Sequence, residues 1–397
     1  EAEASVPVAI PRKRAWEAAH GGEVPARPFV AARVAGWPRP RRQRWRPPAS
    51  DAAFLHRIAR DTWLGLVAFT DTEHALPVDH VRLGPSGGRQ DARVGDYTNV
   101  TSIGLYLAST VAAHELGLTT RAAAVARVRA VLATLEQLET HDGLFFNYYD
   151  TTSLERSSNF LSSVDLGWLT AGLMVVRQGL PELQDAATRW IERGDWRRFY
   201  DPVAGRLRHG WWVPQKRPSR FQYGVLYAES RLASLIAIGL GAAPPSHWFG
   251  MVRTFPAACG WQRQVPRGRT VGESLGTAVH GGWYEWRGLR YVPSWGGSMF
   301  EALMPTLMVD EARWAPVSLG RNDAVHVEVQ RRFATETLGL PVWGFSSSAT
   351  LAPGGYGEHG VPDLGSLGYG PGVVTPYAAA LALAVDPAAA TENLRAL

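Results

Sequence analysis

The sequence contains almost no cysteine and no long apolar run. Cys259 is the single cysteine among 397 residues, which excludes an intramolecular disulfide and a cysteine-based metal cluster. No stretch of about 18 uninterrupted apolar residues occurs, so we predict no membrane-spanning helix. HExxH and EF-hand patterns are absent and the histidines are scattered, so we expect neither a metal nor a cofactor.

Positive charge is concentrated near the N-terminus. The net charge is +5, and the stretch "RPRRQRWRPP" carries much of the excess. Basic segments can bind nucleic acid, but no zinc-finger, RRM or P-loop pattern accompanies this one, so we expect no nucleic-acid partner. We interpret residues 1–50 as an arm that precedes a single domain over residues 51–397. The first four residues, "EAEA", are typical of a yeast secretion-leader remnant, which favours a secreted or periplasmic protein.

Helical periodicity extends over most of the remaining chain. Helices that are apolar on most faces alternate with helices that carry a single apolar stripe. The first kind is buried on most sides and the second covers a core from outside, so the alternation predicts an all-α toroid of two concentric layers. Three long glycine- and tryptophan-rich loops, the middle one with short strands, would gather at one mouth. The predicted helices cover residues 51–69, 102–118, 121–143, 163–180, 181–194, 224–241, 298–314, 321–339, 376–387 and 388–397, and the loops cover 195–223, 242–297 and 340–375.

Aromatic residues are numerous, with 16 tryptophans beside 41 glycines. Flat rings stack on sugar faces, and glycines let the backbone approach, so this composition is typical of a carbohydrate groove. Burial in the core explains any one tryptophan equally well. The candidates for stacking on sugars are Trp211, Trp212, Trp283, Trp286, Trp295 and Tyr356. The candidates for binding sugar hydroxyls are Tyr149, Asp150 and Glu358.

Two carboxylates occur in apolar surroundings. Glu301 interrupts the apolar stretch "WGGSMFEALMP", and Glu229 stands in "YAESRLASLIAIG". An unpaired buried carboxylate is costly, and an apolar wall raises its pKa while a helix N-terminus favours its ionised form. Two carboxylates in unequal surroundings are what cleavage of a glycosidic bond requires. A surface position for Glu229, or a pairing with Arg231, is the alternative.

Other candidate positions carry weaker signals. Asp165, at the start of a predicted buried helix, is either a site residue or an N-terminal cap. Ser274 in "GESLG" matches a nucleophile elbow, but no hydrophobic strand precedes it, so we discount a serine hydrolase. The glycines of "GYGEHG" lack the βαβ unit that dinucleotide binding requires.

Six blocks of sequence, taken together, resemble a known family. They cover about residues 60–385 in one order, and they indicate the glucoamylase-like family of β-1,2-glucan enzymes. That family includes the endo-β-1,2-glucanases of glycoside hydrolase family 144 and the cyclisation module of cyclic β-1,2-glucan synthases. The blocks are "TSIGLYLASTVAAHELGL", "FFNYYDTTSL", "SSVDLGWLTAGL", "YAESRLASLIAIGLG", "SWGGSMFEALMP" and "YGEHGVPDLG" followed by "VVTPYAAALAL".

The resemblance implies a fold and an activity. The expected fold is an (α/α)6 toroid with an acidic pair in its central cavity. Glu229 matches the general acid, Glu301 matches the nucleophile of retaining members, and Asp165 matches a family aspartate. The expected partner is a polysaccharide or oligosaccharide substrate, and the expected reaction is hydrolysis of a β-glucan, most simply β-1,2-linked.

Three departures from the family pattern leave the linkage open. Ser102, Leu166 and Trp168 replace polar family residues at positions expected to face the sugar. A different linkage is therefore one alternative. A retaining transglycosylase and a non-catalytic glycan-binding toroid are two more. The distance between the two carboxyl groups bears on the stereochemistry, because about 5 Å favours retention and about 6.5 to 9.5 Å favours inversion.

Overall fold

The chain forms two compact units. The computed structural model describes residues 33–34, 46–82, 93–349 and 356–397. Of these described residues, those between 33 and 199 and those of 208–221 form the N-terminal unit, and those of 200–207 and between 222 and 397 form the C-terminal unit. Most of the basic arm lies outside the described residues. No helix within the described ranges is long and apolar enough to cross a membrane.

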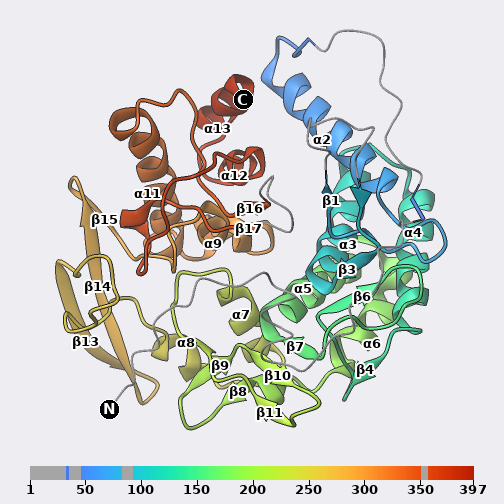
Figure 1. Ribbon diagram of the computed structural model, residues 1–397, viewed down its shortest axis with the longest axis horizontal. Helices are drawn as coiled ribbons and strands as arrows, with labels where there is room; N and C mark the ends of the chain where they lie inside the picture. Colours follow the sequence, from blue (N-terminus) through green and yellow to red (C-terminus); the bar gives the residue numbers. More distant parts are fainter. Residues whose placement is uncertain (1–32, 35–45, 83–92, 350–355) are drawn as a thin grey trace. The chain divides into compact units, whose positions relative to one another are not determined.

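The N-terminal unit consists mainly of helices at the positions that periodicity predicted (Figure 1). Ser50, Asn99, Thr120 and Ser162 cap the first four through side-chain hydrogen bonds. The predicted helix over residues 121–143 is shorter than expected, because a hairpin turning at Gly143 (φ 75°) follows it. The helices are α2 (Asp51–Ala68), α3 (Val100–Glu115), α4 (Arg121–Leu135), α5 (Ser163–Gly179) and α6 (Gln184–Arg193), with single 3-10 turns η1 (Pro181–Leu183) and η2 (Trp196–Phe199).

Glycines allow α3 and α5 to pack backbone against backbone. A Cβ atom on Gly104 would lie 2.3 Å from the carbonyl oxygen of Trp168, and one on Gly172 would lie 2.1 Å from that of Gly104. Short antiparallel strands border these helices. They are β1 (Val81–Arg82) with β2 (Arg93–Val94), β3 (Tyr97–Asn99) with β6 (Tyr148–Asp150), β4 (Thr140–His141) with β5 (Leu144–Phe145), and the sheet β11 (Arg217–Pro218), β10 (Gly210–Trp212), β7 (Phe160–Ser162).

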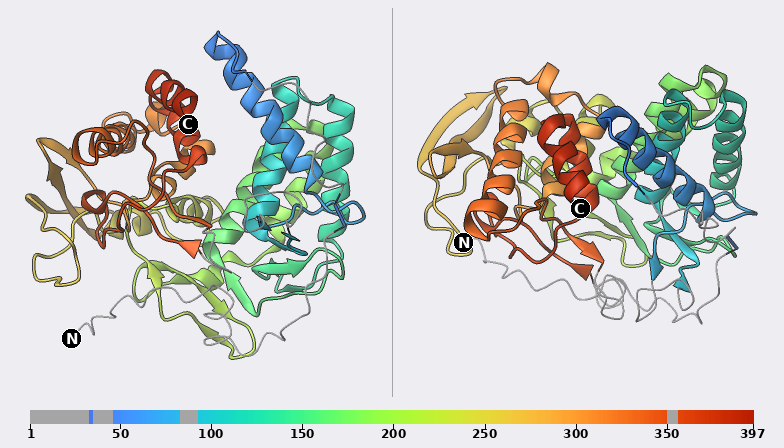
Figure 2. Two further views of the ribbon diagram at one scale, coloured as in Figure 1. Left: turned by 45° about the horizontal axis from the view of Figure 1, so that its top comes forward. Right: turned by 90° about the horizontal axis from the view of Figure 1, so that it is seen from above.

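The C-terminal unit mixes helices with a long hairpin. Strands β13 (Gly268–Ser274) and β14 (Thr277–Trp286) form an extended ribbon, gold in Figure 2, which β15 (Leu289–Tyr291) continues. The helices are α7 (Arg231–Gly239), α8 (Ser246–Gly250), α9 (Met299–Leu303), α10 (Glu311–Trp314), α11 (Leu319–Arg332), α12 (Pro376–Leu381) and α13 (Pro387–Ala396). Shorter elements are β8 (Tyr200–Asp201), β9 (Arg206–Arg208), β12 (Gln222–Tyr223), η3 (Met304–Leu307), the π-helical turn η4 (Phe333–Thr337), β16 (Ser348–Ala349), β17 (Tyr356–Gly357), η5 (Pro362–Leu364) and η6 (Ala382–Ala384).

Two predicted helices of this unit are wrong in part. The helix expected over residues 224–241 begins only at Arg231, because Val225 forms a parallel bridge with Val252 and keeps the preceding backbone extended. The helix expected over residues 298–314 breaks after Leu303, where Pro305 lacks the N–H that a continuing helix needs. Both interruptions fall next to the two glutamates of the predicted acidic pair.

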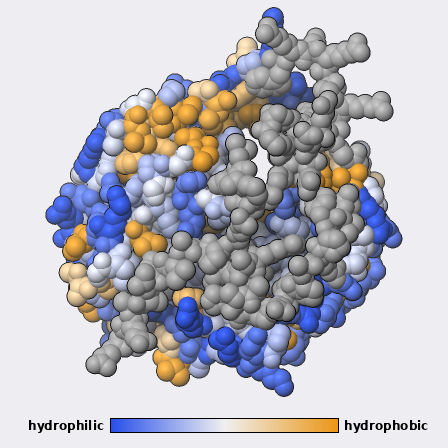
Figure 3. All heavy atoms as spheres, viewed as in Figure 1, coloured by the Kyte–Doolittle hydropathy of each residue, from blue (hydrophilic) through white to orange (hydrophobic). Residues whose placement is uncertain are grey.

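One core organises the C-terminal unit. Helix α9 packs against both α11 and α12. Tyr227, Tyr284, Met299 and Val329 are among the buried residues of the core cluster. Figure 3 shows an apolar area on the surface where Figure 1 places the C-terminal helices α11 to α13. The chain is therefore helix-rich, with short strands in each unit.

Candidate active site

Glu301 lies in the first turn of α9 and is 4% exposed. Its Oε2 accepts a hydrogen bond from the Ser294 hydroxyl at 2.8 Å and another from the backbone N–H of Gly296 at 2.7 Å. Ser294 is held in turn, because its Oγ accepts the N–H of Gly297 at 2.9 Å. The short stretch before the helix thus folds back to bind the carboxylate that the helix presents.

The two glycines before α9 are required by a close crossing of two backbone segments. A Cβ atom on Gly296 would lie 2.0 Å from the ring of Tyr369. Gly297 has φ +78°, and a Cβ atom there would lie 2.0 Å from the carbonyl oxygen of Val361. The crossing is fastened by backbone hydrogen bonds, including Tyr369 N–H to Gly296 O at 2.8 Å. The "WGG" stretch therefore brings residues 361–369 against the backbone that precedes Glu301.

A second set of contacts fixes the start of α9. Gln330 donates to the Gly297 carbonyl at 3.0 Å and to the Phe345 carbonyl at 3.1 Å. Ser346 Oγ accepts the N–H of Phe300 at 3.1 Å and the hydroxyl proton of Tyr377 at 2.7 Å. The helix start that carries Glu301 is therefore held by partners from several distant segments, as a preorganised site requires.

Glu229 and Glu301 interact electrostatically. Burial, and next the negative charge of Glu229, raise the pKa of Glu301 from 4.5 to about 8, against opposing hydrogen bonds from Gly296, Ser294 and Ser298. Glu229 itself lies in the turn just before α7 and is partly exposed. It is therefore not on the apolar face of a helix, as its sequence context suggested, but at a helix start. The alternative pairing with Arg231 is wrong, since that guanidinium binds Glu311.

A third carboxylate and a tyrosine complete the acidic cluster of this unit. The Tyr369 hydroxyl donates to Glu358 Oε1 at 3.1 Å. Burial, and then the charges of Glu301 and Glu358, raise the pKa of Tyr369, so its phenol keeps its proton. Burial also raises the pKa of Glu358. Glu358 was expected from sequence to bind substrate, whereas Tyr369 was missed because it lies in an ordinary glycine-rich stretch.

Asp165 belongs to the N-terminal unit. It stands in the first turn of α5, and its Oδ1 accepts the hydroxyl of Thr101 at 2.8 Å. The interpretation of Asp165 as a helix cap is wrong, because Ser162 is the cap and accepts the N–H of Asp165 at 3.3 Å. A catalytic role for Asp165 stays a prediction.

Tyr149 and Asp150 have structural contacts rather than open positions. The Tyr149 side chain is fully buried, and its hydroxyl donates to the Glu139 carbonyl at 2.6 Å while accepting the N–H of Phe146 at 2.8 Å. A hydroxyl used in this way does not reach a sugar, so that expectation is corrected. Asp150 Oδ1 accepts the N–H groups of Thr152 and Ser153 at 2.8 and 2.7 Å, which is the geometry of a turn.

The candidate aromatic residues divide by exposure. Trp212 and Trp286 are 3% and 8% exposed, so they belong to the core and not to a stacking surface. Trp211 and Trp283 are half-buried under Arg198 and Arg290, with guanidinium-to-ring distances of 4.8 and 4.7 Å. Trp295 is also half-buried, 5.5 Å from the ring of Trp261, and Tyr356 is 61% exposed. Trp295 immediately precedes the glycine whose N–H binds Glu301, and its role in binding a sugar stays a prediction.

One further expectation is corrected, and the decision to discount a nucleophile elbow at Ser274 is confirmed. Leu166 and Trp168 are 3% and 2% exposed, so they fill the core of the N-terminal unit and do not face a substrate. Ser274 ends strand β13 and pairs with Thr277 across the turn Leu275–Gly276, which is a hairpin and not a nucleophile elbow. Within the described ranges, no group of three or more His, Cys, Asp or Glu side chains could hold a metal ion.

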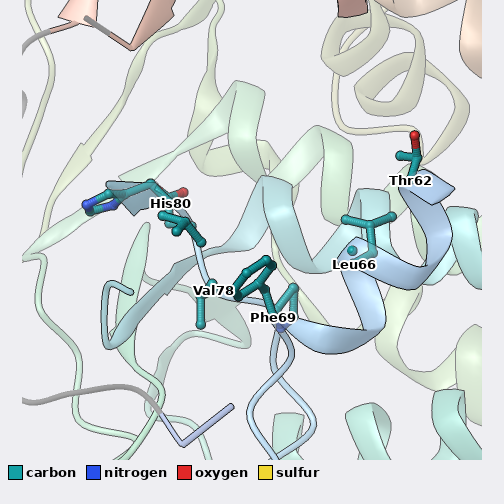
Figure 4. Close-up of a pocket in the computed structure, with 9 residues that line it drawn as sticks. Thr62, Leu66, Phe69, Val78 and His80 are labelled. Atoms are coloured by element: carbon teal, nitrogen blue, oxygen red, sulfur yellow. The ribbon is translucent and has the colours of Figure 1, made fainter. Parts of the chain in front are cut away.

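A pocket occurs in the N-terminal unit between the end of α2 and the segment that leads to β1 (Figure 4). Leu66, Phe69 and Val78 give it an apolar wall, and His80 stands at one end. Asp79 is the only carboxylate in its lining. The pocket therefore lacks the acid pair that the C-terminal unit contains.

Comparison with known proteins gives matches along most of the chain. Residues 271–397 match the Glycoamylase family model, which describes glucoamylase-like proteins, and residues 85–209 match DUF3131, a family of unknown function. The cyclic β-(1,2)-glucan synthase NdvB of Rhizobium meliloti is 31% identical over 240 residues, which are 59% of this chain and 7% of NdvB. The chain thus spans a small fraction of that relative.

Solved structures share the fold. A β-1,2-glucanase from Parabacteroides distasonis has a TM-score of 0.68 at 16% identity, with 88% of this chain and 50% of that chain covered. An endo-β-1,2-glucanase from Chitinophaga pinensis, in complex with sophorotriose and glucose, has a TM-score of 0.61 at 13% identity, with coverage of 88% and 82%. Together with the sequence matches, these likenesses confirm that the chain resembles the glucoamylase-like family of β-1,2-glucan enzymes.

Proposed function

We propose that this chain is a glycoside hydrolase that cleaves β-1,2-linked glucan with the carboxylates of Glu229 and Glu301. The observation that carries the proposal is a buried carboxyl group whose pKa is raised to about 8 by burial and by a second glutamate. At neutral pH such a coupled pair holds one proton between two carboxyl groups. Cleavage of a glycosidic bond requires that state, with one group as acid and the other ionised.

The chemistry follows from this shared proton. The protonated carboxyl donates to the leaving glycosidic oxygen, and the ionised one activates water or attacks the sugar. The family resemblance assigns the donor role to Glu229 and the nucleophile or base role to Glu301. In the free protein the raised pKa puts the proton on Glu301. Substrate binding beside the pair would therefore have to transfer that proton to Glu229 before the assigned roles apply.

Several finer features belong to the same proposal. The likeness to β-1,2-glucanase folds supports an (α/α)6 toroid, and the resemblance supports a polysaccharide substrate bound near Trp295 and Glu358. We further propose a secreted or periplasmic location, since a polymeric glucan is met outside the cytoplasm. Asp165 is retained as a candidate site residue on the resemblance alone.

The test is incubation with linkage-defined β-glucans. We expect shorter oligosaccharides from β-1,2-glucan and little product from β-1,3- or β-1,4-glucan. NMR identifies the anomer of the newly formed reducing end before it equilibrates. An excess of the β-anomer indicates retention, and of the α-anomer inversion. If only another linkage is cleaved, the proposed β-1,2 specificity is wrong and the substrate is a different glucan. Binding of β-1,2-glucan without any product would replace it with a glycan-binding protein.

A transglycosylase is the second candidate function. The observation that favours it is the match to a glucan synthase, whose name assigns it to cyclic β-(1,2)-glucan. This activity predicts products longer than the starting oligosaccharide, or cyclic ones, when a single β-1,2-linked oligosaccharide is the substrate. Mass spectrometry of such a reaction separates transfer from hydrolysis.

A further inference from the structure

We propose that Arg231 is the positioning residue of the acidic pair, because its guanidinium ties the turn that carries Glu229 to the helix that carries Glu301. This inference rests on the proposed function and names the group that sets the separation of the two carboxylates. Arg231 begins α7 and is completely buried. From the sequence, Arg231 was interpreted only as a possible ion-pair partner of Glu229.

The guanidinium binds the backbone on both sides of the site. Nη1 donates to the carbonyl of Ala228, the residue just before Glu229, at 3.1 Å. Nη1 also donates to the carbonyl of Glu301 itself at 3.2 Å, and Nη2 donates to that of Ala302 at 2.6 Å. One planar group therefore fixes two chain segments that are far apart in sequence, at the positions where the carboxylates leave the backbone.

The remaining donors hold the guanidinium in place. Nε donates to Glu311 Oε1 and Nη2 donates to Glu311 Oε2, each at 2.8 Å, in a bidentate pair. Arginine has five N–H donors, and these contacts use every one of them. The ammonium of a lysine has three donors and no planar fork, so it does not reproduce the set.

The surroundings prevent the arginine from turning. The Tyr227 ring lies 4.7 Å from the guanidinium carbon, and the Tyr227 hydroxyl donates to Asp323. Asp323 Oδ1 is 3.9 Å from Nη2 of Arg231. Burial, and next the charge of Glu311, raise the pKa of Asp323 to about 7, so near neutral pH one proton is kept beside the single positive charge. The buried cluster is then close to neutral overall.

The experiment compares Arg231→Lys with a matched control, Arg331→Lys. Arg331 pairs with Glu328 on the exposed side of α11 in the same unit, with side-chain exposures of 44% and 34%. Two readouts are used. The first is the pH titration of the infrared carboxyl band that disappears in Glu301→Gln. The second is kcat and KM on β-1,2-glucan for folded protein.

The positioning role predicts a shift in the titration of Glu301. The charge of Glu229 acts on this carboxyl, and the charge of Glu301 acts on Tyr369 and Tyr377; all three residues keep their identity in the variant. If Arg231 sets the separation, loosening it weakens both burial and the effect of Glu229. The Arg231→Lys titration then moves from about 8 toward 4.5 by about one pH unit or more. A purely structural role lowers the melting temperature and leaves the titration unchanged.

The kinetic readout follows the same geometry. We expect kcat to fall about 100-fold in Arg231→Lys while KM stays within about threefold, since a displacement of about 1 Å costs a factor of this size. Arg331→Lys should alter neither readout. A folded Arg231→Lys protein with an unmoved titration and kcat within about threefold of the parent overturns the proposal.

Two outcomes keep the inference separate from the proposed function. If the parent cleaves no glycan but the titration shifts in Arg231→Lys, the positioning role stands and the proposed function falls. If Arg231→Lys does not fold, Glu311→Gln answers instead, because it keeps Arg231 and removes one charge-assisted contact. We expect a smaller titration shift in the same direction, and no shift in Glu311→Gln counts against the proposal.

Discussion

Each unit of the molecule buries a carboxylate that stood out in the sequence, and the two are used differently. Asp150 in the N-terminal unit is 6% exposed, and its Oδ1 accepts two N–H groups from the next three residues. Glu301 in the C-terminal unit is 4% exposed, but a second glutamate acts on it and raises its pKa. Burial is common to both, so it does not mark the chemistry. The nearby second acid does.

Removing the charge of Glu301, Glu229 or Asp150 should change activity by very different amounts. Glu301→Gln and Glu229→Gln should each lower kcat on β-1,2-glucan by about 10² to 10⁴-fold, because each removes the acid or the ionised partner. Asp150→Asn should keep kcat within about threefold, since an asparagine oxygen accepts the same turn hydrogen bonds. Steady-state kinetics of purified variants checks this. Equal losses of kcat in all three variants would show that the glutamate pair has no special role in catalysis.

The second prediction concerns pH. Activity should fall about tenfold per pH unit above about 8, where Glu301 loses the proton that the pair shares. The pH profile of kcat/KM for the parent protein checks it, because that ratio reports the ionisations of the free enzyme. An activity that rises steadily from pH 8 to 10 would contradict a shared proton.

The same pKa has a consequence for stability. Glu301 has a folded pKa of about 8 against 4.5 for a free side chain, so its favourable contribution is complete below pH 4.5 and is lost as pH rises through 8. Relative to Glu301→Gln, the parent should therefore lose on the order of a few kcal/mol of unfolding free energy between pH 4.5 and 8. Urea unfolding at several pH values measures it. A constant difference between the two proteins would argue against the raised pKa.

Gly297 and Gly288 both have a positive φ, but only Gly297 is crowded by neighbouring backbone. Gly297→Ala should destabilise the protein by about 3 kcal/mol or more, because the new Cβ would lie 2.0 Å from a backbone oxygen at φ +78°. Gly288→Ala is the control, since Gly288 has φ +83° but nothing within 4 Å of an added Cβ. It should cost only about 1 to 2 kcal/mol. Thermal unfolding of both variants gives the difference, and similar losses would mean that the crossing of segments is not tight.

The smallest effect tests the correction at Tyr149. Tyr149→Phe removes two internal hydrogen bonds and should cost about 1 to 3 kcal/mol of stability while leaving kcat and KM on β-1,2-glucan unchanged. A rise in KM of tenfold or more, with stability intact, would restore Tyr149 as a substrate-binding residue.

Much of the secondary structure followed from the sequence, and the site followed in part. Periodicity located α2, α3, α5 and α6, because apolar or amphipathic stretches of helical length, bounded by capping residues, leave few alternatives. It predicted helix wrongly at residues 224–230, where a backbone bridge between Val225 and Val252 joins two segments that no local pattern relates. Tertiary contacts therefore overrode helix propensity beside Glu229.

Some site residues could be identified from local sequence, and others depend on contacts with distant segments. Glu301 was identifiable because a lone carboxylate in an apolar stretch is costly unless it is used or paired. Arg231 and Tyr369 were not, since their importance depends on which distant carbonyls and carboxylates they meet. Tyr149, Trp212 and Trp286 were overestimated, because composition does not separate aromatic residues that stack on sugars from those that fill a core.

The hydrogen bonds to Glu301 from Ser294 and Gly296 join residues at most seven positions apart, whereas Arg231 joins segments 70 positions apart. Closing a short loop costs less chain entropy than closing a long one. The turn of Ser294 and Gly296 that binds the Glu301 carboxylate is therefore able to form early in folding. The contacts of Arg231 with residues 301 and 302 form only after distant segments have come together. The ratio of the change in folding activation free energy to the change in stability should therefore be larger for Ser294→Ala than for Arg231→Lys. Stopped-flow refolding of both variants would decide whether the two sets of contacts form in that order.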